Sequence, residues 1–221
     1  MAAREEGGPE VLLTLTHPRT YTARRRADTD AHVTPTAHTA DVPVVRTDRG
    51  GDVTYHGPGQ LVAYPVVALA HARAVRHHVE ALEASVVDVA RSYGVDARPA
   101  TARPSGAPRT GPPRTGVWVG DDKLAAIGVR VTGRTTSHGL ALNVDPDLRD
   151  FAGIVPCGIR DGGICSLASL GVDAGLTEVR ERLVGALCAR LGRRGVDTAP
   201  HDLGVPPPSL PSAVRAAGGA A

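Results

Sequence analysis

Long apolar runs are missing from this sequence of 221 residues, and we expect no signal sequence. The best apolar stretch covers only residues 61–70 and is interrupted by Pro65, so it is too short to span a membrane. The N-terminus is charged and lacks the apolar segment of a secretory signal peptide. The three cysteines are odd in number and have no paired spacing, which argues against a disulfide framework. We therefore expect a cytoplasmic protein that does not contact a membrane.

A strong charge of either sign is also missing. The formal net charge is +2 at pH 7, whereas nucleic-acid-binding domains usually carry a strongly basic face. The length suits one domain with its own core. We expect this domain to cover residues 11–200, with disordered segments at 1–10 and 206–221, and to act as a monomer without nucleic acid.

Lysine is almost absent, because Lys123 is the only one in a chain whose other strongly basic residues are arginines. A lysine ammonium can give up its proton, whereas an arginine guanidinium stays charged, so the two are not interchangeable in proton transfer. All four isoleucines fall between residues 127 and 164. Apart from the initial methionine, the other residue types that occur once are Gln60, Trp118, Asn143 and Phe151. This clustering indicates that side-chain identity matters around residue 60 and over residues 118–164.

Periodicity predicts a single domain of the α/β (α+β) class. Helical spacing of apolar residues predicts helices at 72–93 and 177–191, the second with Thr177 as its N-cap residue. Residues 117–119 and 123–131 are expected to form a hairpin. Further strands are predicted at 11–15, 42–46, 61–67 and 137–144, and residues 145–165 are expected to form a long loop.

The most specific local pattern is the glycine-rich segment RGGDVTYHGPGQ at residues 49–60. Its glycines let the backbone approach a ligand closely. It is not a P-loop, because no Gly-Lys-Ser/Thr follows, and the strand after it does not fit a dinucleotide fingerprint. From the residues alone it is either a ligand-binding segment or a structural loop.

Cys157 lies between a proline and a glycine, which predicts an exposed turn. A nucleophilic cysteine acts as its thiolate, and a nearby ammonium such as that of Lys123 favours this form. The alternatives are a buried structural cysteine and an exposed hairpin lysine. Cys165 and Cys188 are interpreted as structural, and the absence of a Cys-x-x-Cys pattern argues against a metal site.

The segment at 49–60 resembles the signature of the lipoyl(octanoyl) transferase family, whose members are octanoyl-[acyl carrier protein]:protein N-octanoyltransferases. Four further segments resemble the same family over residues 11–191: TGVWV at 115–119, KLAAIGVR at 123–130, SHGLALN at 137–143 and IVPCGI at 154–159. The resemblance implies the catalytic fold of biotin and lipoate protein ligases, with a mixed sheet and flanking helices. It implies an acyltransferase without a cofactor, with Cys157 as the acyl-thioester residue and Lys123 as the residue that lowers its pKa.

The resemblance also implies octanoyl-acyl carrier protein as the donor, and lipoyl domains of 2-oxoacid dehydrogenase complexes and the glycine cleavage H protein as acceptors. Two alternatives remain: an ATP-dependent lipoate or biotin ligase, and a non-catalytic module that binds lipoyl domains or acyl carriers. The implied substrate-binding residues are Arg49, Gly50, Gly51, Asp52, Val53, Thr54, Tyr55, His56, Ala126, Ile127, Gly128, Gly139, Leu140 and Ala141.

Overall fold

The computed structural model describes residues 8–24, 42–100, 115–154 and 163–198. The expectations for residues 1–7 and 206–221, and for the turn that contains Cys157, lie outside the described residues. No helix in these ranges is both long and apolar enough to cross a membrane.

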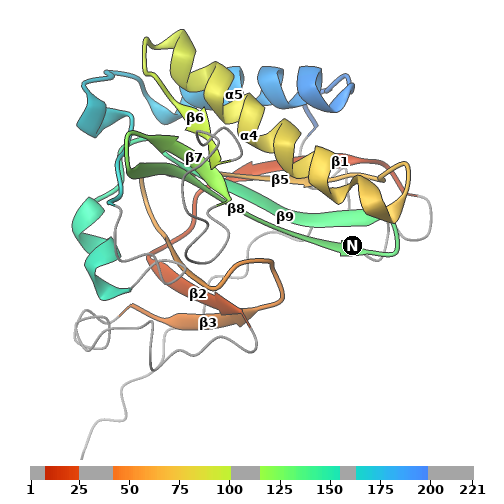
Figure 1. The fold of residues 1–221 in the computed structure, drawn as a ribbon, viewed down its shortest axis with the longest axis horizontal. Coiled ribbons are helices and arrows are strands. Elements are labelled where there is room, and N and C mark those ends of the chain that lie inside the picture. The colour runs from red at the N-terminus through yellow and green to blue at the C-terminus, as the bar shows by residue number, and fades with distance from the viewer. Residues whose placement is uncertain (1–7, 25–41, 101–114, 155–162, 199–221) are drawn as a thin grey trace, which may run out of the picture.

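A six-stranded antiparallel sheet forms the middle layer (Figure 1). Its long central strands alternate apolar side chains that pack on the helices with residues that face the opposite side. In sheet order the strands are β1 (Val11–Leu15), β5 (Gln60–Val66), β9 (Thr135–Asn143), β8 (Asp122–Thr132), β7 (Gly116–Val119) and β6 (Arg98–Pro99).

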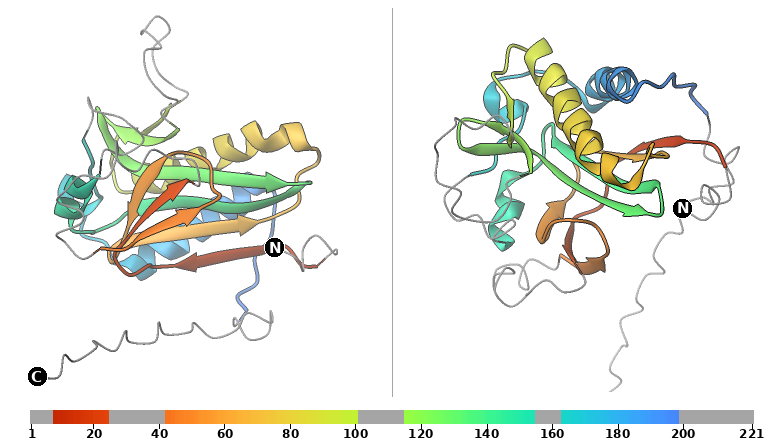
Figure 2. Two further views of the ribbon diagram at one scale, coloured as in Figure 1. Left: turned by 90° about the horizontal axis from the view of Figure 1, so that it is seen from below. Right: turned by 45° about the vertical axis from the view of Figure 1, so that its right-hand side comes forward.

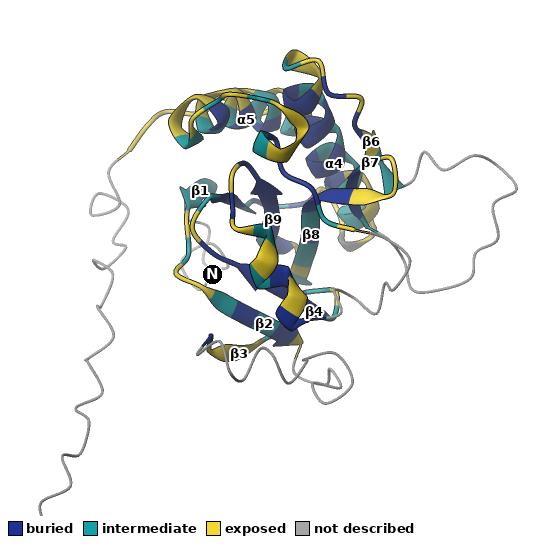
Figure 3. Ribbon diagram, turned by 90° about the vertical axis from the view of Figure 1, so that its left-hand side faces the viewer, coloured by how far each residue is buried: buried dark blue, intermediate teal, exposed yellow. Residues whose placement is uncertain are grey.

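Two helices, α4 (Val75–Ser92) and α5 (Leu176–Leu191), lie side by side on one face of this sheet. Their apolar stripes, including Leu82, Val86, Leu183 and Leu187, are buried against the sheet and form the main core. The outward face of α5 is exposed, whereas α4 is exposed only at its two ends (Figure 3). Three short 3₁₀ segments lie at Ala72–Ala74 (η1), Leu148–Gly153 (η3) and Ala168–Leu170 (η5).

A second, three-stranded sheet lies on the side of the large sheet away from the helices (Figures 1 and 2). Its order is β3 (Val44–Thr47), β2 (Thr20–Arg24) and β4 (Val53–His56), with β2 parallel to β3 and antiparallel to β4. A small core of its own, which includes Tyr21, Tyr55 and Phe151, joins it to the 3₁₀ segment η3.

The structure confirms both helices and the six predicted strand regions, with shifts of one to three residues at most ends. Three differences matter. A third of the glycine-rich segment is strand β4, and the strand β2 was not predicted. The α5 helix begins after Gly175 without a side-chain cap, so Thr177 is not its N-cap residue. The predicted mixed sheet is resolved into two sheets, of which only the small one contains a parallel pair.

Candidate active site

A pocket lies between the two sheets, where the glycine-rich segment crosses strands β8 and β9. Most of its residues come from three places: the 49–56 segment, the strands β5, β8 and β9, and the two sides of the segment that carries Cys157. The lining residues are Arg49, Gly50, Gly51, Thr54, His56, Gln60, Tyr64, Thr115, Lys123, Ala126, Ile127, Gly128, His138, Gly139, Leu140, Ala141, Asn143, Phe151 and Ile164.

Strand register explains why two predicted groups far apart in the sequence meet in this pocket. In the antiparallel pair of β8 and β9, Gly128 lies opposite Gly139, Ile127 opposite Leu140 and Ala126 opposite Ala141. The three residues 126–128 therefore face the three residues 139–141 directly. The predicted substrate-binding residues on these two strands all line the same pocket.

Glycine at position 128 allows the glycine-rich segment to lie directly on the sheet. The Gly50 amide donates to the carbonyl of Val129 at 3.1 Å. A Cβ atom on Gly128 would lie 2.6 Å from the Gly50 carbonyl oxygen, closer than real Cβ atoms approach. A side chain at position 128 would therefore push the segment off the sheet and change this wall of the pocket.

Three predicted substrate-binding residues do not line the pocket: Asp52, Val53 and Tyr55. Val53 and Tyr55 are buried in the small core, because alternate residues of β4 point to opposite faces of their sheet. The Asp52 carbonyl accepts from the Arg24 amide and from the Arg49 guanidinium. These residues hold the segment in place, and their neighbours Thr54 and His56 face the pocket.

Arg49 is buried beside the pocket, and its guanidinium joins the glycine-rich segment to β2. It donates to the Thr22 carbonyl at 2.6 Å and to the Thr22 hydroxyl at 2.9 Å. It also donates to the carbonyls of Gly50 and Asp52, at 3.1 and 3.0 Å. Burial is the largest effect that lowers the pKa of the nearby histidines His56 and His138, and the positive charge of Arg49 acts in the same direction.

Lys123 is buried, with 6% of its surface exposed, so it is not the surface lysine of a hairpin. Its ammonium lies 4.8 Å from the centre of the Trp118 ring, a cation–π distance, and Lys123 also lines the pocket. Its amide donates to the Gly163 carbonyl at 3.0 Å, and its carbonyl accepts from the Cys165 amide at 3.1 Å. The backbone that follows the Cys157 segment is thus held alongside Lys123.

The residues that flank the Cys157 segment both reach the pocket. Phe151 precedes the segment, Ile164 follows it, and both line the pocket. Cys165 is buried, and burial raises the pKa of its thiol to about 12, which agrees with its interpretation as a structural cysteine. Where the thiol of Cys157 lies relative to Lys123 falls outside the described residues.

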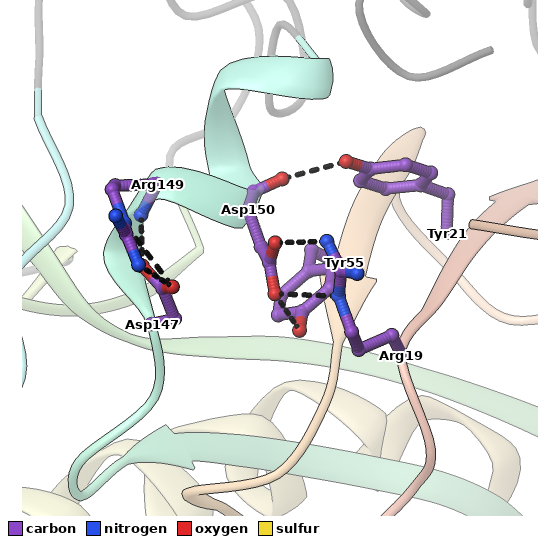
Figure 4. Close-up of polar contacts among 6 residues, drawn as sticks. All are labelled: Arg19, Tyr21, Tyr55, Asp147, Arg149 and Asp150. Atoms are coloured by element: carbon purple, nitrogen blue, oxygen red, sulfur yellow. Dashed lines mark hydrogen bonds and ion pairs between the residues drawn. The ribbon is translucent and has the colours of Figure 1, made fainter. Parts of the chain in front are cut away.

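A network around Asp150 anchors the 3₁₀ segment η3 to the small sheet (Figure 4). The Asp150 carboxylate accepts from the Tyr55 hydroxyl at 2.5 Å. It also accepts from two nitrogens of the Arg19 guanidinium, Nε and Nη2. The Asp150 carbonyl accepts from the Tyr21 hydroxyl at 2.7 Å. Burial and the neighbouring Asp150 carboxylate raise the pKa of Tyr55 well above its ordinary value, so this phenol remains a donor. By contrast, the neighbouring Arg149 forms an ion pair with Asp147 at the protein surface, and Figure 4 draws no contact between Arg149 and the Asp150 network.

A chain of buried side-chain amides runs along the pocket floor from His56. The ring nitrogen Nδ1 of His56 lies 3.2 Å from the Gln60 side-chain oxygen. The Gln60 amide donates to Asn143 Oδ1 at 2.9 Å, and the Asn143 amide donates to the Cys165 carbonyl at 2.9 Å. The sequence pointed to Gln60 and Asn143 through their rarity, but not to Tyr64, which reaches the pocket from the adjoining strand β5.

Sequence and structure comparisons relate this chain to the catalytic domains of lipoate protein ligases. The sequence model of the family described as "Lipoyl protein ligase A/B catalytic domain" matches residues 1–188. Among solved structures, a bi-partite lipoate protein ligase of Thermoplasma acidophilum superposes with a TM-score of 0.68 at 15% identity, covering 92% of this chain and 88% of that one. Lipoate-protein ligase A bound with ATP gives a TM-score of 0.65 at 19% identity, with coverages of 89% and 80%. The fold is that of the biotin and lipoate protein ligase catalytic domains.

Within this class, two similar curated sequences are octanoyltransferases. An octanoyltransferase of Mycolicibacterium gilvum (strain PYR-GCK) is 46% identical over 207 residues, which is 89% of this chain and 80% of that protein. An octanoyltransferase of Mycobacterium tuberculosis (strain ATCC 25177 / H37Ra) is 47% identical over 193 residues, with coverages of 86% and 77%. The chain belongs to the octanoyltransferase family.

Proposed function

We propose that this chain transfers an octanoyl group from octanoyl-acyl carrier protein to a lysine of a lipoyl domain, through a thioester on Cys157. Membership of the octanoyltransferase family makes the chain an acyltransferase of protein lipoylation. The observation that carries the choice of residues is the burial of the only lysine, Lys123, in the pocket that the flanks of the Cys157 segment also line. We expect the enzyme to act as a monomer.

The first half of the proposed reaction exchanges one thioester for another. The Cys157 thiolate attacks the thioester carbonyl of the donor, and the carbon–sulfur bond to the carrier's pantetheine arm breaks. The departing thiolate takes a proton from the Lys123 ammonium. Because a thioester replaces a thioester, the step is close to thermoneutral and needs no ATP.

In the second half, neutral Lys123 takes a proton from the ammonium of the acceptor lysine, which then attacks the acyl-enzyme as an amine. The nitrogen loses its second proton, the Cys157 thiolate leaves, and an amide forms. Conversion of a thioester into an amide is strongly favourable and drives the cycle. The proposed acceptors are the lipoyl domains of 2-oxoacid dehydrogenase complexes and the glycine cleavage H protein.

An ATP-dependent ligase is the main competing function. Sequence identity argues against it, since the octanoyltransferases match at 46% and 47% whereas the ligase structures match at 15% and 19% and support the fold alone. A ligase would adenylate free octanoate, whereas the proposed enzyme uses the carrier-bound acyl group without ATP.

Intact-mass measurement after incubation with octanoyl-acyl carrier protein tests the proposal. We expect one added octanoyl group on the wild type without ATP, and transfer of this group to a lipoyl domain added later. Cys157→Ser should abolish both, whereas Cys188→Ser, a control in the last helix, should retain both. An unmodified wild type, or a requirement for ATP, would contradict the proposal.

A further inference from the structure

The hydrogen bonds along the pocket floor fix which nitrogen of His56 carries a proton. A carbonyl oxygen only accepts, so the Cys165 carbonyl requires the Asn143 amide group to face it. The Asn143 oxygen then faces Gln60, which must donate to it with its own amide. The Gln60 oxygen is left to face His56 Nδ1, so Nδ1 must be the protonated nitrogen of the neutral ring.

The other ring nitrogen of His56, Nε2, therefore carries the lone pair. Within the part of the chain that the structure describes, no hydrogen bond to Nε2 is found, and the ring lines the pocket. An acyl chain offers no donor to this nitrogen. The group that it suits is a polar N–H or S–H donor of a substrate that enters the pocket.

Counting protons identifies such a donor. The acceptor lysine enters as an ammonium with three N–H bonds and leaves as an amide with one, so it loses two protons in each cycle. Lys123 accounts for one of them, because it regains from the acceptor the proton that it gave to the departing pantetheine sulfur. The second proton leaves the nitrogen only after the new carbon–nitrogen bond has formed, and it needs a second base.

We propose that His56 Nε2 accepts this second proton from the nitrogen of the tetrahedral intermediate, while the Cys157 thiolate is expelled and the amide forms. The resulting imidazolium returns its proton to solvent. This inference rests on the proposed function, and it adds a second proton-accepting residue to the transfer half of the reaction.

The surroundings of His56 keep its lone pair available at neutral pH. Burial is the largest effect, and the nearby His17, Arg49 and His138 act in the same direction, whereas the hydrogen bond to Gln60 opposes them. Together they lower the pKa of His56 to about 4. Lys123 lines the same pocket, and its ammonium form would also disfavour a charged imidazole.

Separating the two half-reactions tests the inference. His56→Asn places an amide N–H near the position of Nδ1 and so can keep a bond to Gln60, but it has no basic nitrogen. In single-turnover experiments we expect transfer from the acyl-enzyme to a lipoyl domain to slow about 100-fold, with a much smaller effect on acylation by octanoyl-acyl carrier protein. Equal slowing of both steps, or transfer at the wild-type rate, would overturn the proposal.

Two further measurements distinguish proton transfer from a structural role. In His56→Ala, added imidazole should restore formation of octanoyl-lysine, in proportion to the neutral imidazole present, without accelerating acylation. Long-range ¹H–¹⁵N spectra of the wild type should show a proton on Nδ1 and none on Nε2. Failure of imidazole rescue in a folded variant, or a proton on Nε2, would contradict the role of His56. Absence of any acyl-enzyme in the wild type would instead contradict the proposed function and leave the tautomer result standing.

Discussion

At the scale of single residues, Lys123 is a buried side chain that can carry a positive charge, and burial and charge usually exclude each other. It is buried, with 6% of its surface exposed, and it carries the only ammonium side chain of the sequence. Burial disfavours an ammonium, whereas the face of the Trp118 ring at 4.8 Å partly stabilises it. Such a balance suits a group that must both hold and release a proton.

Two substitutions of Lys123 separate its charge from its proton. Lys123→Arg keeps a cation near Trp118 that cannot be deprotonated, and Lys123→Met removes the charge. We expect both to lower octanoyl transfer at least 100-fold. If the Lys123 charge stabilises the Cys157 thiolate, as we propose, the midpoint of Cys157 alkylation against pH should lie below the ordinary thiol value in the wild type and in Lys123→Arg. It should move towards the ordinary thiol value in Lys123→Met.

Peptide-resolved mass spectrometry is the measurement, because Cys165 and Cys188 are also present. Cys165 serves as an internal control, since burial raises the pKa of its thiol to about 12 and it should stay unmodified in the folded protein. Full transfer activity in Lys123→Arg would show that Lys123 acts through its charge alone.

At the scale of elements, the sequence predicted the large sheet better than the small one. Strands β8 and β9 are long and joined by a short turn, so local pattern predicted both strands. The pocket residues that they bring together were implied by the family resemblance. Strand β4 has only four residues between glycines, and its partner β2 lies about thirty residues earlier in the chain. Pairing over this separation leaves little local signal, so β2 was missed and β4 was interpreted as loop.

In the candidate site, too, part of the arrangement could be predicted from the sequence and part could not. Residues of the glycine-rich segment were predicted as one block, because the resemblance covers the whole motif. Strand alternation then divides this block: Thr54 and His56 face the pocket, and Val53 and Tyr55 face the small core. Without knowledge that residues 53–56 form a strand, the two faces could not be separated.

The Asp150 network yields a prediction about how the 3₁₀ segment η3 is held. Asp150→Ala leaves the hydroxyl of Tyr55, a residue with 1% exposure, without its acceptor, which should lower the free energy of unfolding by about 1–3 kcal/mol. Because η3 precedes the Cys157 segment, we also expect slower acylation. Urea unfolding and the single-turnover acylation rate measure the two effects.

Two variants on the same segment serve as controls. Asp150→Asn keeps a carbonyl oxygen for Tyr55 and should be less destabilising than Asp150→Ala. Arg149→Gln breaks an ion pair whose arginine is 90% exposed, so we expect no measurable change in stability or acylation. If all three variants behaved alike, the network would not be what anchors η3.

At the scale of the whole molecule, the fold holds two buried histidines in their neutral form. His78 on α4 is 4% exposed, and neither of its ring nitrogens has a hydrogen-bond partner among the described residues. Burial lowers its pKa to about 4, and the pKa of His56 is lowered to about 4 as well. Unfolding returns both side chains to water, where a histidine has a pKa of about 6.5.

The unfolded chain therefore binds more protons than the folded chain between about pH 4 and pH 6.5, so stability should fall as the pH falls through this window. Each histidine can contribute up to about 1.4 kcal/mol per pH unit. We expect the urea midpoint of the wild type to decrease between pH 7 and pH 5. His78→Leu should reduce this decrease. It should also keep or raise stability at pH 7, because it removes a buried polar group that lacks a partner among the described residues. His77→Leu, at a neighbouring position whose side chain is 85% exposed, should leave the decrease unchanged. An equal decrease in the wild type and in His78→Leu would mean that the protons responsible for acid lability are bound elsewhere in the unfolded chain, and that helix α4 accommodates a charged imidazole at its buried face.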